Sequence, residues 1–143
     1  MKHIAIIYAT KTKHSKKLAD AIGNAIGVEA KNIDDQPLIK DVDLLFIVGG
    51  IYGGLSSPKL LEFVQTINQQ SVKEFALVTS CLSKRHQQKD VRNVMTGKGA
   101  VFIDEFVSRG ALLFLYMRHP NKTDMEDAVA FATRIIDNQS LTV

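Results

Sequence analysis

The sequence predicts an α/β fold, namely a single doubly wound sheet of five parallel strands with helices on both faces. Short apolar runs rich in β-branched residues alternate along the chain with segments whose apolar residues recur at helical spacing. The strongest run, 42–48, is apolar on both faces from Leu44 to Val48, which is typical of a central strand in a parallel sheet. Strands that alternate with helices in this way favour parallel pairing through right-handed crossovers.

The elements follow one another at intervals that fit this fold. The expected strands are 2–9, 28–33, 42–48, 75–79 and 100–107. The expected helices are 15–25, 58–67, 87–95 and a last helix that Thr123 opens as part of a capping box. The first helix places four apolar residues on one face, which are Leu18, Ala19, Ile22 and Ala25. Ser57 and Pro58 are the expected N-cap and first residue of the second helix.

Composition narrows the class of protein. The chain has 143 residues, of which 45% are hydrophobic and 23% charged, as in ordinary globular domains. No apolar run approaches the roughly 20 residues that span a bilayer, and we expect neither a membrane span nor a signal peptide. The single cysteine, Cys81, suits a reducing compartment, so we expect a cytoplasmic protein. The net charge of +3 comes without a nucleic-acid reader motif, and no Cys/His cluster has metal-ligand spacing.

The joint between the first strand and the first helix is suited to an anion. It reads Thr10-Lys11-Thr12-Lys13-His14-Ser15 and contains no carboxylate. A helix that starts directly after a strand leaves its first N–H groups unpaired, and the helix dipole adds partial positive charge there. Three hydroxyls and two lysines at this point predict a phosphate site. The alternative is that the hydroxyls only form turns and caps, and that the lysines belong to a solvated face.

Two further loops are expected at the same edge, because ligands of such sheets bind beyond the carboxyl ends of the strands. The first is Gly49–Ser57, which holds Gly50, Ile51, Tyr52, Gly53 and Gly54. The second is Ser80–His86, which begins with Ser80, Cys81, Leu82 and Ser83. Glycines allow close approach of a backbone to a ligand, and an aromatic ring can stack on a planar one. Tyr52 is therefore a candidate ring contact, with an ordinary surface tyrosine as the alternative.

These loops and the order of the elements resemble those of the flavodoxin family. The family's phosphate loop reads Ser/Thr-x-Thr-Gly-Asn-Thr/Ser. The run 10–15 matches its three hydroxyl positions and carries Lys13 and His14 in place of Gly and Asn. No long insertion splits the fifth strand, so the chain is similar to the short-chain form, and we expect one flavodoxin-like domain over residues 1–143.

The resemblance implies FMN as the cofactor. Its phosphate would lie at the first loop, and its ring would lie between the other two. The residues that the resemblance assigns to FMN are Thr10, Lys11, Thr12, Lys13, His14, Ser15, Gly50, Ile51, Tyr52, Gly53, Gly54, Ser80, Cys81, Leu82 and Ser83.

The function implied by the resemblance is electron transfer by an FMN-binding protein of flavodoxin type, to a partner protein or a small-molecule acceptor. One alternative is an FMN-dependent NAD(P)H:quinone-type reductase of the same fold. Another is a flavodoxin-like binding module that has lost FMN, because Lys13 and His14 depart from the family pattern. No Ser/His/Asp or paired-carboxylate spacing stands out, so any redox chemistry would belong to the cofactor. A response-regulator receiver is excluded, because its acidic positions hold Thr10-Lys11 and Gly49-Gly50.

For three features of the sequence, two interpretations remain open. Cys81 fits an inert small apolar residue at a strand end, or a reactive thiol that lacks an evident base. The run Ala111–Met117 fits core or sheet-edge packing, or an exposed patch near the cofactor or at a homodimer interface. We expect His14 to be exposed in its loop, as a bare surface histidine or as a contact to the phosphate.

Overall fold

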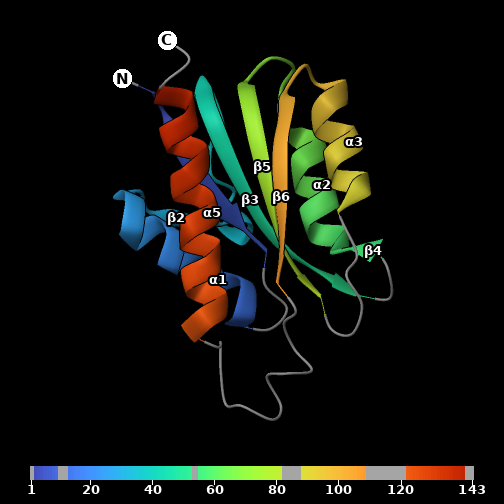
Figure 1. Ribbon diagram of the computed structural model, residues 1–143. Coiled ribbons are helices and arrows are strands. Elements are labelled where there is room, and N and C mark those ends of the chain that lie inside the picture. Colours follow the sequence, from blue (N-terminus) through green and yellow to red (C-terminus); the bar gives the residue numbers. More distant parts are fainter. Residues whose placement is uncertain (1, 10–12, 53–54, 82–87, 109–121, 141–143) are drawn as a thin grey trace.

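The computed structural model describes residues 2–9, 13–52, 55–81, 88–108 and 122–140. Its elements along the chain are β1 (Ile4–Tyr8), α1 (Lys13–Ile26), β2 (Ala30–Asn32), a 3₁₀ turn η1 (Ile33–Asp35), β3 (Val42–Tyr52), β4 (Leu55–Ser56), α2 (Pro58–Thr66), β5 (Val72–Cys81), α3 (Lys89–Gly97), β6 (Val101–Ser108) and α5 (Lys122–Ser140). The parallel strands lie in the order β2-β1-β3-β5-β6, and the short β4 pairs antiparallel with β3 (Figure 1). The expected doubly wound sheet of five parallel strands is confirmed.

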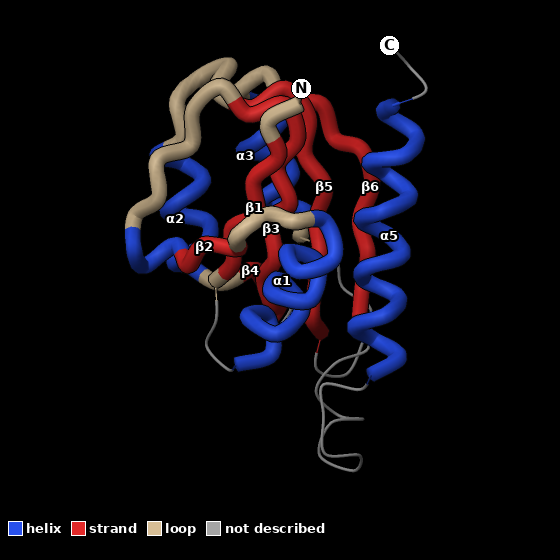
Figure 2. Tube along the Cα trace, turned by 90° about the vertical axis from the view of Figure 1, so that its left-hand side faces the viewer, coloured by secondary structure: helices blue, strands red, loops and turns tan. Residues whose placement is uncertain are grey.

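Helices cover both faces of the sheet and enclose two apolar layers. Figure 2 shows the sheet nearly edge-on, with α2 and α3 on one side and α1 and α5 on the other. Under α2 and α3 lie side chains such as Leu45, Leu60 and Met95, and under α1 and α5 lie side chains such as Phe46 and Leu18. Leu45 and Phe46 are adjacent in β3 and point to opposite faces, as strand geometry requires. This is why the central strand is apolar at every position from Leu44 to Val48.

Local chemistry explains where the first half of the chain changes direction. Gly27 has a φ of 75°, which ends α1 without the steric cost that a side chain would add. The second strand is shorter than the expected 28–33 because the side chain of Asn32 accepts a hydrogen bond from the backbone N–H of Asp34, 2.9 Å away. That bond starts η1 and stops the strand. Ala25 lies exposed, and the apolar face of α1 continues from Ile22 to the partly buried Ile26 instead.

The later elements lie close to the expected ranges. Ser57 is the N-cap of α2 and Pro58 its first residue, as expected, although the Ser57 side chain makes no capping hydrogen bond. The last helix begins at Lys122, so Thr123 lies inside its first turn instead of capping it. Ala128, Ala132 and Ile135 of that helix are buried, so one of its faces packs on the core.

Candidate functional site

The carboxyl ends of β1, β3 and β5 lie next to one another at one edge of the sheet (Figure 1). Tyr8 at the end of β1 is in register with Val48, and the backbone N–H of Ala9 donates to the carbonyl of Val48 over 3.0 Å. Farther along β3, Gly50 is in register with Ser80 of β5. The segments expected to bind the ligand therefore start from neighbouring strands, as the doubly wound topology requires.

The N-terminus of α1 lies at this edge and starts earlier than expected. The helix begins at Lys13, so His14 and Ser15 belong to its first turn. His14 is 8% exposed and Ser15 is 2% exposed, and the expectation of an exposed His14 is wrong. An earlier helix start turns both side chains toward the protein. The first turn of α1 contains no acidic residue, which leaves its unpaired N–H groups suited to an anion.

The second expected loop is partly a strand, which corrects the sequence interpretation. Gly49, Gly50, Ile51 and Tyr52 continue β3, and they pair in parallel with β5 as far as Ile51, which lies opposite Cys81. Leu55 and Ser56 then return as β4. The two glycines of β3 lie within the sheet, where they do not mark a loop.

Packing explains the glycine at position 49. A Cβ on Gly49 would lie 2.5 Å from Cδ2 of Leu60 and 3.1 Å from Oε1 of Gln88. Leu60 and Gln88 are both completely buried. The strand can therefore continue beneath them only because position 49 has no side chain.

The third expected loop also begins later than expected. Ser80 and Cys81 are the last residues of β5 and not the first residues of a loop. Ser80 is half-buried and is in register with Ser108 at the end of β6. The Ser108 hydroxyl is buried and has no hydrogen-bond partner among the described residues, so it adds an available polar group at this edge.

Several of the expected cofactor residues lie outside the described residues. They are Thr10, Lys11, Thr12, Gly53, Gly54, Leu82 and Ser83. The run Ala111–Met117 and the residues Lys84 to His86 are outside them as well. For Lys13, Tyr52 and Cys81 the structure describes the backbone alone. The assignment of the full set to FMN stays a prediction.

Sequence reasoning missed a buried polar cluster next to the end of β5, made of Thr79, Gln88 and Glu105. Oε2 of Glu105 accepts hydrogen bonds from the Thr79 hydroxyl over 2.5 Å and from the Gln88 backbone N–H over 2.9 Å. The Gln88 side-chain amide donates to the Thr79 hydroxyl over 2.9 Å. Thr79 and Gln88 are both 0% exposed. The one sequence signal was a glutamate inside the apolar run 100–107. We call these three residues the Glu105 cluster.

A second polar contact joins β4 to the start of α3. The Ser56 hydroxyl donates to Oδ1 of Asp90, and the Ser56 backbone N–H donates to Oδ2 over 3.3 Å. Oδ1 of Asp90 also accepts from the backbone N–H of Val91 over 2.8 Å. Asp90 lies in the first turn of α3, where its charge complements the helix dipole. The returning strand β4 is thereby fixed to α3.

Burial raises the pKa of the Glu105 carboxyl, although the hydrogen bonds from Thr79 and Gln88 and the nearby Arg92 oppose the increase. The folded protein therefore keeps this proton at pH values where the unfolded chain has released it. The free energy of unfolding must then fall as the pH rises from the ordinary pKa of a glutamate through the raised one.

We expect the substitution Glu105→Gln to remove this pH-dependent loss, because an amide carries no charge to desolvate. Urea unfolding of both proteins across this pH range measures the difference. The variant should gain stability relative to the wild type as the pH rises. Glu62→Gln, at an exposed position of α2, is the control and should leave the pH profile unchanged. Parallel profiles for wild type and Glu105→Gln would contradict the assignment of the buried charge.

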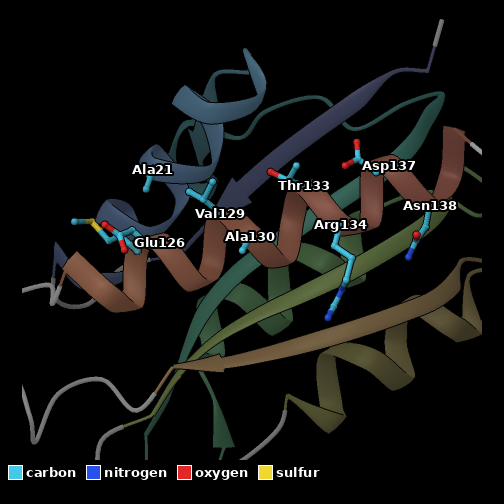
Figure 3. Close-up of a pocket in the computed structure, with 9 residues that line it drawn as sticks. Ala21, Glu126, Val129, Ala130, Thr133, Arg134, Asp137 and Asn138 are labelled. Atoms are coloured by element: carbon cyan, nitrogen blue, oxygen red, sulfur yellow. The ribbon is translucent and has the colours of Figure 1, made fainter.

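Two hollows lie along the helices α5 and α1. An open groove of about 750 Å³ runs along the outer side of α5, lined by residues such as Val129, Ala130 and Thr133, with Ala21 of α1 beside it (Figure 3). A second, more polar hollow of about 560 Å³ lies between α1 and β2 and reaches Tyr8, Lys16 and Asp20. The described residues contain no group of three or more His, Cys, Asp or Glu side chains that could hold a metal ion.

Comparison with known families shows to which family a protein with this fold belongs. A family model described as "Flavodoxin domain" matches residues 5–130, from the first strand to the middle of the last helix. The chain belongs to the flavodoxin domain family. The resemblance inferred from the phosphate loop and the element order is thus confirmed.

Several proteins match this flavodoxin-domain protein over nearly their whole length. The uncharacterized protein MJ0298 of Methanocaldococcus jannaschii is 26% identical over 150 residues, which cover 96% of this chain and 100% of the relative. A short-chain flavodoxin associated with a non-canonical PDU bacterial microcompartment has a TM-score of 0.71 at 16% identity, covering 96% of this chain and 99% of its own. An azoreductase from Bacillus anthracis has a TM-score of 0.70 at 12% identity, with coverages of 94% and 100%.

These structural likenesses show the fold and leave the ligand and the reaction of this flavodoxin-domain protein to be proposed. None of its described helices combines the length and the hydropathy that a bilayer crossing requires.

Proposed function

We propose that this protein binds FMN at the carboxyl edge of its sheet and transfers electrons to a partner protein or a small-molecule acceptor. The observation that supports this most is the position of the α1 N-terminus. It follows β1 directly, carries no acid in its first turn, and lies beside the ends of β3 and β5. Helix N-termini of this kind bind phosphate groups through their free N–H groups and dipole.

The residues present fit such a cofactor. The buried Ser15 in the first turn of α1, with the hydroxyls and lysines of Thr10 to Lys13, would hold the phosphate. The backbone at the ends of β3 and β5, at Tyr52 and Cys81, would border the ring. FMN supplies the redox chemistry when bound, and the protein supplies binding, orientation and electrostatics. We also propose a cytoplasmic location, because the single cysteine, Cys81, suits a reducing compartment.

We expect the protein to bind FMN at least about tenfold more tightly than riboflavin, because the charge-assisted hydrogen bonds at α1 form only with a phosphate. Fluorescence quenching titrations of the apoprotein with each flavin measure the two dissociation constants. An absorbance spectrum of the protein as purified shows whether a flavin is retained. Equal affinity for the two flavins would contradict the phosphate site.

The same preparation tests the alternative functions. Steady-state oxidation of NADH or NADPH by the FMN-loaded protein, faster with a quinone present, would indicate a reductase instead of a carrier. A colourless protein that binds neither flavin would indicate a binding module that has lost the cofactor. Reversible reduction without pyridine-nucleotide oxidation is the result expected of an electron-transfer protein.

A further inference from the structure

An irregularity in β6 determines which acidic side chain reaches the ligand edge. Phe75 of β5 is in register with Phe102, but Leu77 is in register with Glu105. One residue of β5 therefore lies opposite two residues of β6, Ile103 and Asp104, which is the geometry of a β-bulge. A regular strand would place position 104 opposite Leu77.

The bulge decides which face of the sheet each of two neighbouring carboxylates takes. Asp104 lies exposed toward α5, where the guanidinium of Arg134 donates to its Oδ2 over 3.4 Å. Glu105 lies on the face covered by α2 and α3, which is also the face of Leu77 and Thr79. Bulges often re-aim a side chain next to a functional site, and here the side chain is a half-buried carboxylate.

Gln88 joins three elements, which are β6 with this carboxylate, β5 and the start of α3. Its backbone N–H donates to Glu105 of β6, and its side-chain amide donates to Thr79 and, over 3.5 Å, to the carbonyl of Val78 in β5. Its carbonyl accepts the backbone N–H of Arg92 over 2.9 Å, which is the first hydrogen bond of α3. Movement of Gln88 would therefore move the start of α3 relative to the sheet.

Gln88 also lies directly under the part of the sheet assigned to the cofactor. Its Oε1 approaches the position that a Cβ on Gly49 would occupy to 3.1 Å. Gly49 immediately precedes Gly50, which is in register with Ser80. The glutamine thus packs below the ends of both strands that border the proposed ring site.

We propose that Glu105 is a positioning residue for the cofactor edge, which holds Gln88 in place through a contact that changes strength with the protonation of the carboxyl. This inference rests on the proposed function for its effect on FMN, whereas the contact itself does not depend on any ligand. An ionised carboxylate accepts hydrogen bonds about twice as strong as those of a neutral acceptor. Ionised Glu105 therefore fixes Gln88 more firmly than the protonated form does.

The charged groups around Glu105 come from two elements. Arg92 of α3 favours the ionised carboxyl and Asp104 of β6 disfavours it, while burial raises its pKa more than either charge. From β5, the contacting group is the uncharged hydroxyl of Thr79. Arg92 also lies over the Phe102 ring, with its central carbon 4.0 Å from the ring centroid. Among the three residues of the Glu105 cluster, Glu105 is thus the one whose side chain gains or loses a proton.

The first experiment follows the Gln88 amide in the ¹⁵N-labelled apoprotein by NMR, from about pH 4.5 to about pH 8. We expect its chemical shift to follow the titration of Glu105 in the wild type and to stay constant in Glu105→Gln. Asp104→Asn is the matched control, because it removes the neighbouring carboxylate that faces α5. The Gln88 shift should still titrate in this variant, at a lower pH than in the wild type, because the negative charge of Asp104 raises the pKa of Glu105. A Gln88 amide that ignores the titration of Glu105 would overturn the proposal.

The second experiment compares FMN affinity among variants at the two ends of this pH range. Because the FMN phosphate titrates equally with every variant, the informative quantity is the ratio of dissociation constants of variant and wild type. For Glu105→Gln we expect a ratio within about twofold of one near pH 4.5, rising to about fivefold near pH 8. For Glu105→Ala, which cannot accept either hydrogen bond, we expect about tenfold or more at both pH values.

The two measurements separate this proposal from the function on which it rests. A Glu105→Gln ratio that does not change with pH, or wild-type affinity in Glu105→Ala, would overturn the positioning role while FMN binding stands. A wild-type protein that binds no FMN but shows the coupled Gln88 titration would overturn the proposed function and support the contact. The rise of the Glu105→Gln ratio toward higher pH is the result that a purely steric role would not give, because glutamine has nearly the same size and shape as glutamate at every pH.

Discussion

Replacing Thr12 and Ser15 together by alanine should weaken FMN binding by roughly a hundredfold or more. A hydrogen bond from a hydroxyl to a charged group contributes on the order of 1.5–3 kcal/mol, and the phosphate is the charged group that both hydroxyls would bind. Ser15 lies buried in the first turn of α1, so water could not readily replace its hydroxyl. Fluorescence titration with FMN measures the loss, and a change of under about threefold would mean that these hydroxyls only cap the helix.

Two controls isolate the phosphate in this double variant. Thr66→Ala with Thr96→Ala also removes two hydroxyls that bond to helix carbonyls, those of Phe63 and Asn93. These threonines lie at the ends of α2 and α3. This control should leave the FMN affinity within about twofold of the wild type. Affinity for riboflavin should change much less than affinity for FMN in Thr12→Ala/Ser15→Ala, and urea unfolding of the apoprotein shows whether the fold is intact.

The largest effect on stability is expected at Gly23 of α1. A Cβ at this position would lie 2.4 Å from the carbonyl oxygen of Val28, which belongs to the backbone and cannot rotate away. The carbonyl of Gly23 itself accepts the N–H groups of Gly27 and Val28 over 2.9 Å and 3.0 Å, so the two segments are held together at this point. We expect Gly23→Ala to lower the free energy of unfolding by about 3 kcal/mol. The melting temperature should fall by about 10 °C.

Gly97 provides the matched control, since it is also a helical glycine and a Cβ there would meet nothing within 4 Å. We expect Gly97→Ala to change stability by less than about 1 kcal/mol, with a gain from the better helix propensity of alanine. Thermal unfolding of the two variants side by side tests the packing argument. A destabilisation of the same size at both positions would mean that the contact with Val28 does not explain the effect.

The sequence predicted the architecture because the fold depends on patterns that are local. The runs 42–48 and 75–79 and the spacing of Leu18 and Ile22 are visible without any knowledge of contacts. The sequence pattern favours a loop at Gly49 and Gly50, because glycine usually weakens or interrupts strands. Their real role depends on Leu60 and Gln88, which come from later parts of the chain. A strand boundary set by such a tertiary contact cannot be seen in a local pattern.

As with the fold, part of the candidate site could be predicted from the sequence and part depends on tertiary contacts. The helix N-terminus after β1 follows from the topology, so its place at the ligand edge could be anticipated. The burial of His14 could not, because it depends on where α1 begins. The Glu105 cluster was hidden because a bulge reverses the side to which every later residue of β6 points. An alternation pattern counted through Ile103 would assign Glu105 to the wrong face.

The bulge in β6 also affects how copies of this protein behave toward one another. This strand is the last in the sheet order, so its outer N–H and carbonyl groups have no strand beside them within the described part of the chain. A regular edge of eight residues would be a template for a strand of another molecule. The extra residue twists the strand and places the charged Asp104 on its exposed surface. The same irregularity that aims Glu105 inward therefore protects the sheet from edge-to-edge aggregation at high concentration.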